Sequence, residues 1–467
     1  MNSYFLKTLA RYAIFWAMLL ASGPLLAQQK ATYSLTELID SAQKHLPVLL
    51  QKQAMVNSTK AAITEARNSF LPKLTVGDEL SIGAANDLTG TYLPIGGIIH
   101  ATSGGINAEN NLKPQTGNIA SAFAEYDLVN FGLRGARVGN AVATADLQQA
   151  DLNKELYMLK LQLSKLYFNI LKNTYQLHID QENIRRYQSV MTIVNALSGS
   201  GIKPGVDSSM ARAELSKVQM SFNTHEGAVR KLHQQLSFLT GIQASQINLD
   251  TSRKENEFAA GPLLGSVNDT ISNPLISYYR QQQLLYKSAE KLVRKSYLPK
   301  IILAGGAWER GSSIQNANYQ SLGVGLGYQR FTYGGGVAVT YDLFNVVHRR
   351  NKLSVSHFQT QAAEFQLEQQ KQAISSAMAE AQIAVSTAEK NLHELPEQLK
   401  AAQAVYSQKM AQYKAGVIDL IDLTNASFLL YTSQLAYADT LNEWYQANLD
   451  KAAATGNLDQ FIQTIKR

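Results

Sequence analysis

The chain has 467 residues, no cysteine and a formal net charge of +7, with 43 Lys and Arg against 36 Asp and Glu. Without cysteine, the chain can form no disulfide and can carry no lipid thioether at its amino terminus. The basic excess is small and shows no dense cluster, which argues against nucleic acid as a partner. The abundance of Gln, Ala and Ser is more typical of long, half-exposed helices than of a large globular core.

Residues 1–27 have the features of an export signal peptide. Lys7 and Arg11 form a basic start, residues 12–20 form an apolar core, and Leu25-Leu26-Ala27 is a plausible cleavage site. The apolar core is shorter than the roughly 20 residues that a helix needs to span a bilayer. We therefore expect an exported mature chain; a retained anchor is the alternative.

The rest of the sequence contains two copies of one pattern. Leu71-Pro72-Lys73 recurs as Leu298-Pro299-Lys300, and Tyr126-Asp127-Leu128 recurs as Tyr341-Asp342-Leu343. From the second motif onward the offset between the copies stays constant as far as Gly201 and Gly416. Few side chains match in between, so the two copies share the length of this segment but not its sequence. Equal length without equal sequence is expected for two structural rods of the same reach.

Each copy is predicted to contain a short helix, two strands separated by a loop, and a hairpin of two long helices. The first copy covers residues 28–250, with strands at about 72–84 and 117–128 and a helical hairpin at about 131–240. The second copy covers residues 262–457, with strands at about 299–312 and 329–344 and a helical hairpin at about 346–455. Residues 458–467 are expected to be a C-terminal tail.

The long helices carry heptad seams. In the first copy the seam is Leu152, Leu156, Leu159, Leu163, Leu166 and Ile170; in the second it is Ile374, Met378, Ala381, Val385, Ala388, Leu392, Leu395, Leu399, Ala402 and Tyr406. Such 4-3 spacing favours packing of helix on helix, and alanine permits close approach. Pro396 is expected to bend the second helix or end one of its segments. Asp207 is expected to cap the descending helix of the first hairpin.

The predicted strands alternate between apolar and polar residues. Ala120 to Leu128 and Val337 to Leu343 each place apolar residues at every second position. Strands of about 10 residues suit a tilted transmembrane barrel, although a soluble sandwich fits the alternation equally well. Known membrane barrels have at least about 8 strands, and lipid does not tolerate open edges. Four membrane strands per chain would therefore require several chains to share one barrel.

These features together resemble the TolC-like outer-membrane efflux protein family, over nearly all of the mature chain. The resemblance rests on Leu-Pro-Lys before each copy's first strand, Tyr-Asp-Leu-x-Asn after its second, residues 167–171 (Tyr-Phe-Asn-Ile-Leu), Gly-x-x-x-x-x-Asp at both helical turns, and Leu236-x-x-Leu239-Thr240-Gly241. The second copy departs at Val347, where the first has Gly132.

The resemblance implies a mainly helical, internally duplicated fold with transmembrane strands. Three chains would each give four strands to one twelve-stranded barrel in the outer membrane, and their helices would form a coiled-coil tunnel across the periplasm. The implied partners are two further copies of the chain, outer-membrane lipid, a periplasmic adaptor protein and an inner-membrane pump. No cofactor or metal is implied, and the protein would be a passive duct.

The resemblance also implies a gate at the turn of the second hairpin. Asp422 matches an acidic residue facing the threefold axis, and Asn425 stands where the family has a second acid. Three converging carboxylates would attract cations and discourage anions. Tyr413 is expected to hydrogen-bond Asp207 and help to hold the tips shut, whereas Ile418 replaces a family arginine that adds a further latch. Simple helix capping and solvation are the alternative roles for Asp422 and Asp207.

The two hairpin turns are also candidate contacts for the adaptor. Gly201 and Gly416 are expected to adopt the positive φ of a tight helix reversal. Each glycine leaves a tip of small residues that an adaptor hairpin can approach, and Ser198, Ser200 and Lys203 lie near the first.

Enzymatic chemistry has little support in this sequence. The histidines, including His225 and His233, have no metal-ligand spacing and are interpreted as solvated helix-surface residues. Gly323 to Gly327 imitates a nucleotide loop but lacks a following helix, so a flexible β-loop is favoured. Besides the efflux channel, two hypotheses stay open: a type I protein-secretion duct of the same fold, and a soluble periplasmic coiled-coil scaffold.

Overall fold

A computed structural model describes residues 32–84, 86, 109–202, 204–249, 273–315 and 318–466. The predicted signal peptide lies outside the described residues. The chain divides into two compact units. Unit 1 comprises Met1–Gln53, Asp151–Ser277 and Gln369–Arg467, and unit 2 comprises Ala54–Ala150 and Tyr278–Glu368. No helix in the described part of the chain is both long and apolar enough to cross a membrane.

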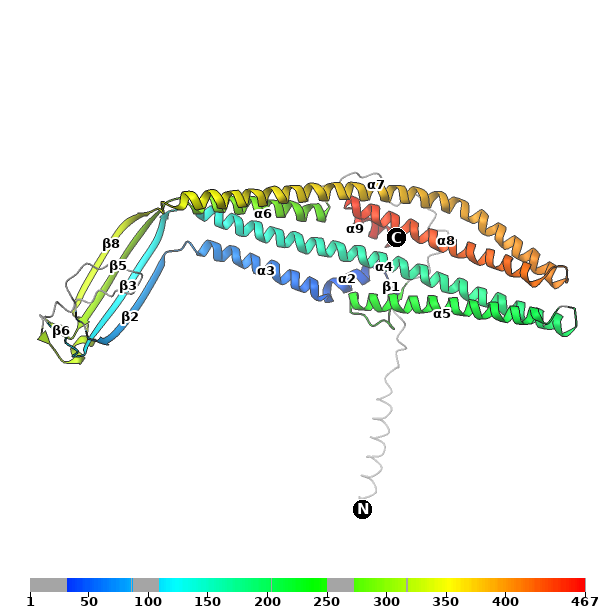
Figure 1. The fold of residues 1–467 in the computed structure, drawn as a ribbon, viewed down its shortest axis with the longest axis horizontal. Coiled ribbons are helices and arrows are strands. Elements are labelled where there is room, and N and C mark those ends of the chain that lie inside the picture. Colours follow the sequence, from blue (N-terminus) through cyan, green and yellow to red (C-terminus); the bar gives the residue numbers. More distant parts are fainter. Residues whose placement is uncertain are drawn as a thin grey trace, which may run out of the picture. The chain divides into compact units, whose positions relative to one another are not determined.

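The described fold is mainly helical and internally duplicated, as predicted (Figure 1). The helices are α2 (Leu35–His45), α3 (Pro47–Asn68), α4 (Leu133–Gly199), α5 (Val206–Thr240), α6 (Pro274–Ser296), α7 (Asn345–Lys414), α8 (Leu420–Thr455) and α9 (Leu458–Lys466). The long strands are β2 (Lys73–Gly83), β3 (Gln115–Val129), β5 (Lys300–Ser312) and β8 (Arg330–Thr340). The short elements are β1 (Thr32–Tyr33), β4 (Asn248–Leu249), β6 (Ile314–Gln315), β7 (Asn318–Tyr319) and the 3-10 helix η3 (Leu322–Leu326).

Proline sets equivalent boundaries in the two copies. Pro47 and Pro274 are the first residues of α3 and α6, where a missing N–H costs nothing because that group has no partner within the helix. The proline of each Leu-Pro-Lys motif then precedes a strand, β2 at Lys73 and β5 at Lys300. Proline excludes the preceding residue from the helical region, so the helix ends and an extended segment begins.

Unit 2 contains the four long strands in one antiparallel sheet, in the order β2-β3-β5-β8. Tyr126 of β3 pairs with Leu303 of β5, which pairs with Val337 of β8. Side chains of directly paired residues point to the same face. The register therefore places Tyr126, Leu303 and Val337 on one side of the sheet. The predicted alternation in the second copy holds only as far as Val339, because β8 ends at Thr340, and Tyr341 and Leu343 lie beyond it. The outer strands β2 and β8 each leave one edge unpaired among the described residues.

The two strand-to-helix junctions of unit 2 differ. In the first copy Phe131 and Gly132 have positive φ (46° and 88°) before α4 begins at Leu133. In the second copy α7 begins at Asn345, which is equivalent to Asn130. Val347, the counterpart of Gly132, lies inside this helix. Because valine does not readily adopt the left-handed conformation, the second junction has no such turn and the helix starts three residues earlier.

The predicted seams form the buried stripes of unit 1. Leu163 and Ile170 of α4 are fully buried, and so are Val385 and Ala388 of α7, while most other positions of α7 are exposed. Helix α7 runs through Pro396 without ending. The heptad seams therefore predicted the packing faces of α4 and α7 correctly. Pro396 does not end a helical segment.

Aromatic packing holds the C-terminal segment of unit 1 in place. Phe168, from the Tyr-Phe-Asn-Ile-Leu motif, stacks on Tyr445 with ring centroids 4.7 Å apart, and Phe461 packs edge-on at 6.3 Å. Phe461 belongs to α9, a helix within the segment 458–467 that was expected to be a tail. Its buried side chains follow helical spacing: Leu458, Phe461, Ile462 and Ile465.

The glycine-rich segment 323–327 is not a flexible β-loop. Residues 323–326 lie in η3, whose residues pack on β3 and β5, and Gly327 is its C-cap. A Cβ on Gly325 would lie 2.2 Å from Oγ1 of Thr116, so only glycine fits this contact. The packing, rather than a nucleotide, accounts for this glycine.

Candidate functional site at the tips of the helical hairpins

Both helical hairpins of unit 1 turn through the same backbone motif. After α4, Gly201 has φ +75°, its N–H bonds the carbonyl of Ser198, and the N–H of Ile202 bonds the carbonyl of Leu197. After α7, Gly416 (φ +73°) and Val417 repeat these bonds at the equivalent place in the second copy. This is a Schellman ending, in which glycine supplies the left-handed residue. The predicted positive φ of both glycines is confirmed.

The tips adjoin through an apolar cluster centred on Tyr413. Tyr413 is 0% exposed and is the largest fully buried side chain among the described residues. Its cluster contains buried residues from the three other long helices: Val190 and Val194 of α4, Ala211 of α5, and Leu420 and Leu423 of α8. Ile418, the position of the expected latch arginine, packs against the same cluster. The ring of Tyr413 is thus a shared core for both turns.

The hydroxyl of Tyr413 donates a hydrogen bond to Oδ2 of Asp207 at 3.2 Å, joining α7 to α5. Burial, the charge of Asp207 and the hydrogen bond to it, and the charge of Asp419 raise the pKa of Tyr413 to about 12. The hydroxyl therefore stays protonated and remains a donor at neutral pH. Asp207 does not cap α5, contrary to expectation, because Gly205 is the N-cap and Asp207 is the second helical residue. Its carboxylate is used for the link between hairpins instead.

Asp422 and Asn425 lie on the exposed surface of α8, one turn apart. The side chain of Asp422 is 51% exposed, and its Oδ2 lies 3.7 Å from Nζ of Lys409. Asp419, not Asp422, occupies the N-cap position of α8. Simple capping therefore does not account for Asp422. Its role in a gate remains a prediction.

The residues of the turns themselves are largely exposed. Ile202 and Val417, which follow the two glycines, are 62% and 73% exposed, while Ser198 is half-buried. A Cβ on Gly416 would lie 3.9 Å from Cγ2 of Ile202, so the two turns are neighbours. Lys203 lies outside the described residues. Contact of this surface with an adaptor remains a prediction.

The structure also contains a buried carboxylate that no sequence motif predicted. Asp180 of α4 is fully buried; its Oδ1 accepts a hydrogen bond from the hydroxyl of Tyr431 at 2.7 Å, and its Oδ2 lies 2.5 Å from Nδ1 of His225. His225 is therefore not a solvated histidine but joins α5 to α4. The sequence does contain an indication of this pair. Asp180 and His225 lie at nearly equal sequence distances on either side of Gly201, so an antiparallel hairpin places them at similar positions along its length.

Further polar contacts surround this carboxylate in unit 1. Arg186 donates hydrogen bonds from Nη2 to Oε1 of Gln434 at 3.0 Å and to Oδ1 of Asn183 at 3.2 Å. Burial lowers the pKa of Arg186. Among the described residues there is no group of three or more His, Cys, Asp or Glu that could hold a metal ion. The bond to Gln434 connects α4 with α8.

Duplicated strand pairs and long helical hairpins closed by matched glycine turns define the fold class of outer-membrane channels. The family model described as "Outer membrane efflux protein" matches residues 38–242 and 271–457. The chain belongs to this family, and it is therefore a TolC-like transport protein of the outer membrane. No curated protein matches the chain.

Solved structures have the same fold at low identity. The outer-membrane channel OprN matches with a TM-score of 0.75 and 16% identity, covering 91% of this chain and 90% of that one. CmeC of Campylobacter jejuni matches with a TM-score of 0.73 and 14% identity, covering 91% and 86%. VceC of Vibrio cholerae matches with a TM-score of 0.71 and 14% identity, covering 90% and 96%.

Proposed function

We propose that the protein is a homotrimeric exit duct of a tripartite efflux system. The observation that supports the trimer best is the open four-stranded sheet of unit 2, with β2 and β8 at its edges. Lipid does not tolerate unpaired backbone groups, so an outer-membrane protein must pair both edges. Because the sheet has four antiparallel strands, its two edge strands run antiparallel to each other. Copies of the chain can therefore join edge to edge and close an antiparallel barrel.

Three copies would give twelve strands, within the range of known barrels, whereas one copy gives too few. In this arrangement the apolar face of the sheet meets lipid and the polar face lines the pore. An inner-membrane pump supplies the energy and an adaptor protein contacts the helical tips, as the family implies. The duct itself is passive, and the pump selects the substrate.

We propose that the tips form the gate of this duct. The buried ring of Tyr413 and its bond to Asp207 hold the two hairpins together, and Asp422 presents an exposed carboxylate. In a trimer three Asp422 side chains would form one negative ring. The purified protein should run as a trimer and form channels in planar bilayers. A protein that carbonate removes from membranes, or that forms no channels, would refute the proposal.

Changing Asp422 to alanine is expected to raise single-channel conductance and lower cation preference. A ring of carboxylates attracts cations and repels anions, so its removal should bring the permeabilities to cations and anions closer together. Reversal potentials across a salt gradient measure the preference. Glu443→Ala, another exposed acid on α8, is the matched control and should leave both quantities unchanged. Equal selectivity in Asp422→Ala and the parent protein would remove Asp422 from the gate.

Changing Gly201 or Gly416 to valine is expected to abolish export while leaving the trimer intact. Each glycine has positive φ, and a left-handed conformation costs other residues roughly 1–2 kcal/mol, so the tip should rearrange locally. Export in cells and trimer mass in detergent measure the two effects. Gly227→Ala, in the interior of α5, is the control and should export normally. Dissociation of the trimer by either valine would point to a purely structural role.

A further inference from the structure

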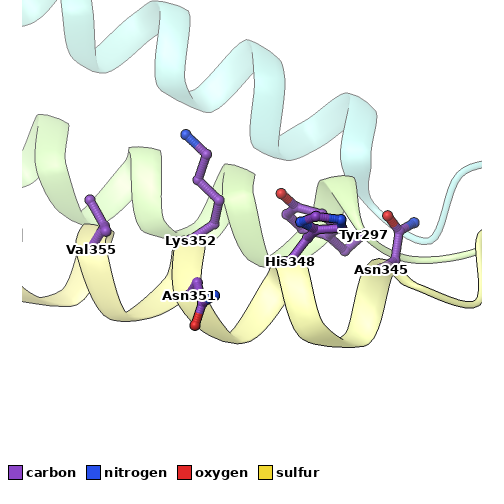
Figure 2. A pocket seen from close by; sticks show the side chains of 6 residues that line it. All are labelled: Tyr297, Asn345, His348, Asn351, Lys352 and Val355. Atoms are coloured by element: carbon purple, nitrogen blue, oxygen red, sulfur yellow. The ribbon is translucent and has the colours of Figure 1, made fainter.

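Unit 2 has an open groove of about 520 Å³ at the start of α7 (Figure 2). Its lining side chains come from the residue that follows α6 and from the first turns of α7: Tyr297, Asn345, His348, Asn351, Lys352 and Val355. In Figure 2 the side chains of Tyr297 and His348 lie together, and Lys352 extends away from the ribbon of α7.

The groove is rich in hydrogen-bond donors and contains no carboxylate. Tyr297, Asn345, His348, Asn351 and Lys352 all carry N–H or O–H groups. None of these side chains makes a hydrogen bond or ion pair with another described residue. Donors that have no acceptor among the described residues, together with the ammonium group of Lys352, suit the oxygens of a phosphate group.

The groove lies at the end of the sheet where all four strands join helices. Tyr297 precedes the start of β5 by three residues, and α7 begins five residues after β8 ends. Lys300 pairs with Thr340, so these two junctions lie at the same end of the sheet. In a membrane-spanning barrel this end is the boundary between lipid and the aqueous side that holds the helices.

Basic residues gather at this boundary although they are dispersed in the sequence. The four junction segments are 65–73, 125–137, 290–300 and 340–352, and they contain eleven Lys and Arg against five Asp and Glu. The basic residues are Arg67, Lys73, Arg134, Arg137, Lys291, Arg294, Lys295, Lys300, Arg349, Arg350 and Lys352. Such clusters next to a membrane attract anionic lipids.

Exposed apolar side chains stand next to the groove. Leu343 and Phe344 are 79% and 77% exposed, and Val346 and Val347 are 62% and 64% exposed. A phospholipid combines a phosphate with acyl chains, and it matches a donor-lined groove beside an apolar surface. A free phosphate ion would use only the groove.

We propose that this groove binds the phosphate headgroup of an anionic phospholipid in the leaflet that faces the helices. The inference rests on the proposed function, because it requires the strands to span the outer membrane. Lys352 and His348 contact the phosphate, and the side chains of Leu343 and Phe344 contact the acyl chains.

Native mass spectrometry of the full chain in detergent tests this proposal. Delipidated protein is incubated with phosphatidylglycerol or with phosphatidylcholine, with and without millimolar inorganic phosphate. The protein is expected to retain phosphatidylglycerol in preference, and inorganic phosphate should not displace it. Lys352→Gln combined with His348→Gln should lower retention by about fivefold or more, because basic residues at the surface supply the attraction. Lys400→Gln, an exposed lysine of α7 outside unit 2, is the control and should retain the lipid fully.

Four results would overturn the proposal: equal retention of both lipids, displacement by inorganic phosphate, unchanged retention in the double variant, or dissociation of the trimer by that variant with lipid still bound. The last result would mean that a second copy covers the groove. Conductance is recorded from the same preparations. Channels that conduct without retaining phosphatidylglycerol refute only the lipid site, whereas preparations without conductance refute the channel.

Discussion

Tyr413→Phe is expected to raise the open probability of the channel, and with it the mean conductance per channel, several-fold at neutral pH. The substitution removes the hydroxyl that donates to Asp207 and keeps the ring that packs between the four helices. A hydrogen bond to a charged acceptor contributes about 1.5–3 kcal/mol, so its loss shifts a closed–open equilibrium by roughly tenfold or more. Tyr413→Ala would additionally empty the cluster and destabilise the tip by about 3–5 kcal/mol. The phenylalanine variant therefore separates the latch from the packing.

Planar-bilayer recording and thermal unfolding measure the two contributions. Tyr406→Phe is the matched control, because Tyr406 packs against the same cluster but its hydroxyl makes no hydrogen bond with a described residue. It should leave conductance unchanged. A Tyr413→Phe channel as closed as the parent would mean that packing alone holds the tips.

The same bond gives the parent channel a pH dependence. The pKa of Tyr413 is raised from 10 to about 12 in the folded protein. The folded state thus holds the proton more tightly than the unfolded state, and this stabilisation is complete below pH 10 and is lost as the pH rises to 12. Conductance of the parent channel should therefore approach that of Tyr413→Phe over this interval.

The sequence predicted those parts of the fold that depend on local pattern or on the repeat. Heptad spacing identified the buried stripes of α4 and α7, and the constant offset between the two copies placed Gly201 and Gly416 in matching turns. The bond between Tyr413 and Asp207 came from the family resemblance, since the partners lie on different hairpins and no local pattern links them.

The parts that were missed depend on contacts between distant segments. His225 was interpreted as solvated because the sequence around it contains no partner for its ring. Its partner, Asp180, lies on another helix, 45 residues away in the chain. The basic residues around the groove are spread over four segments, and only the strand register brings these to one end of the sheet. The early start of α7 was also missed. Val347 replaces the glycine that has positive φ in the first copy, so the segment after β8 has no left-handed turn and enters the helix directly.

Asp180→Ala is expected to destabilise the protein strongly. The carboxylate is fully buried and connects α4 with α5 through His225 and with α8 through Tyr431. Burial and the hydrogen bond to Asp180 raise the pKa of Tyr431, so its hydroxyl remains a donor. Removing one partner of a buried charged group costs about 3–5 kcal/mol, because the remaining polar groups stay buried without a partner.

Denaturant unfolding of the purified protein measures this cost. Asp146 is an exposed acid on α4, and Asp146→Ala is the control, whose free energy of unfolding should stay within about 0.5 kcal/mol of the parent value. Tyr431→Phe removes the hydrogen bond to the carboxylate, together with the one to Ser221, and the loss of the bond to the carboxylate should cost about 1.5–3 kcal/mol. A double-mutant cycle of Asp180→Ala and His225→Ala should give a coupling energy above about 0.5 kcal/mol, as expected for residues in contact. Additive losses would contradict a direct interaction, and the hairpin of α4 and α5 would then depend on its apolar seam alone.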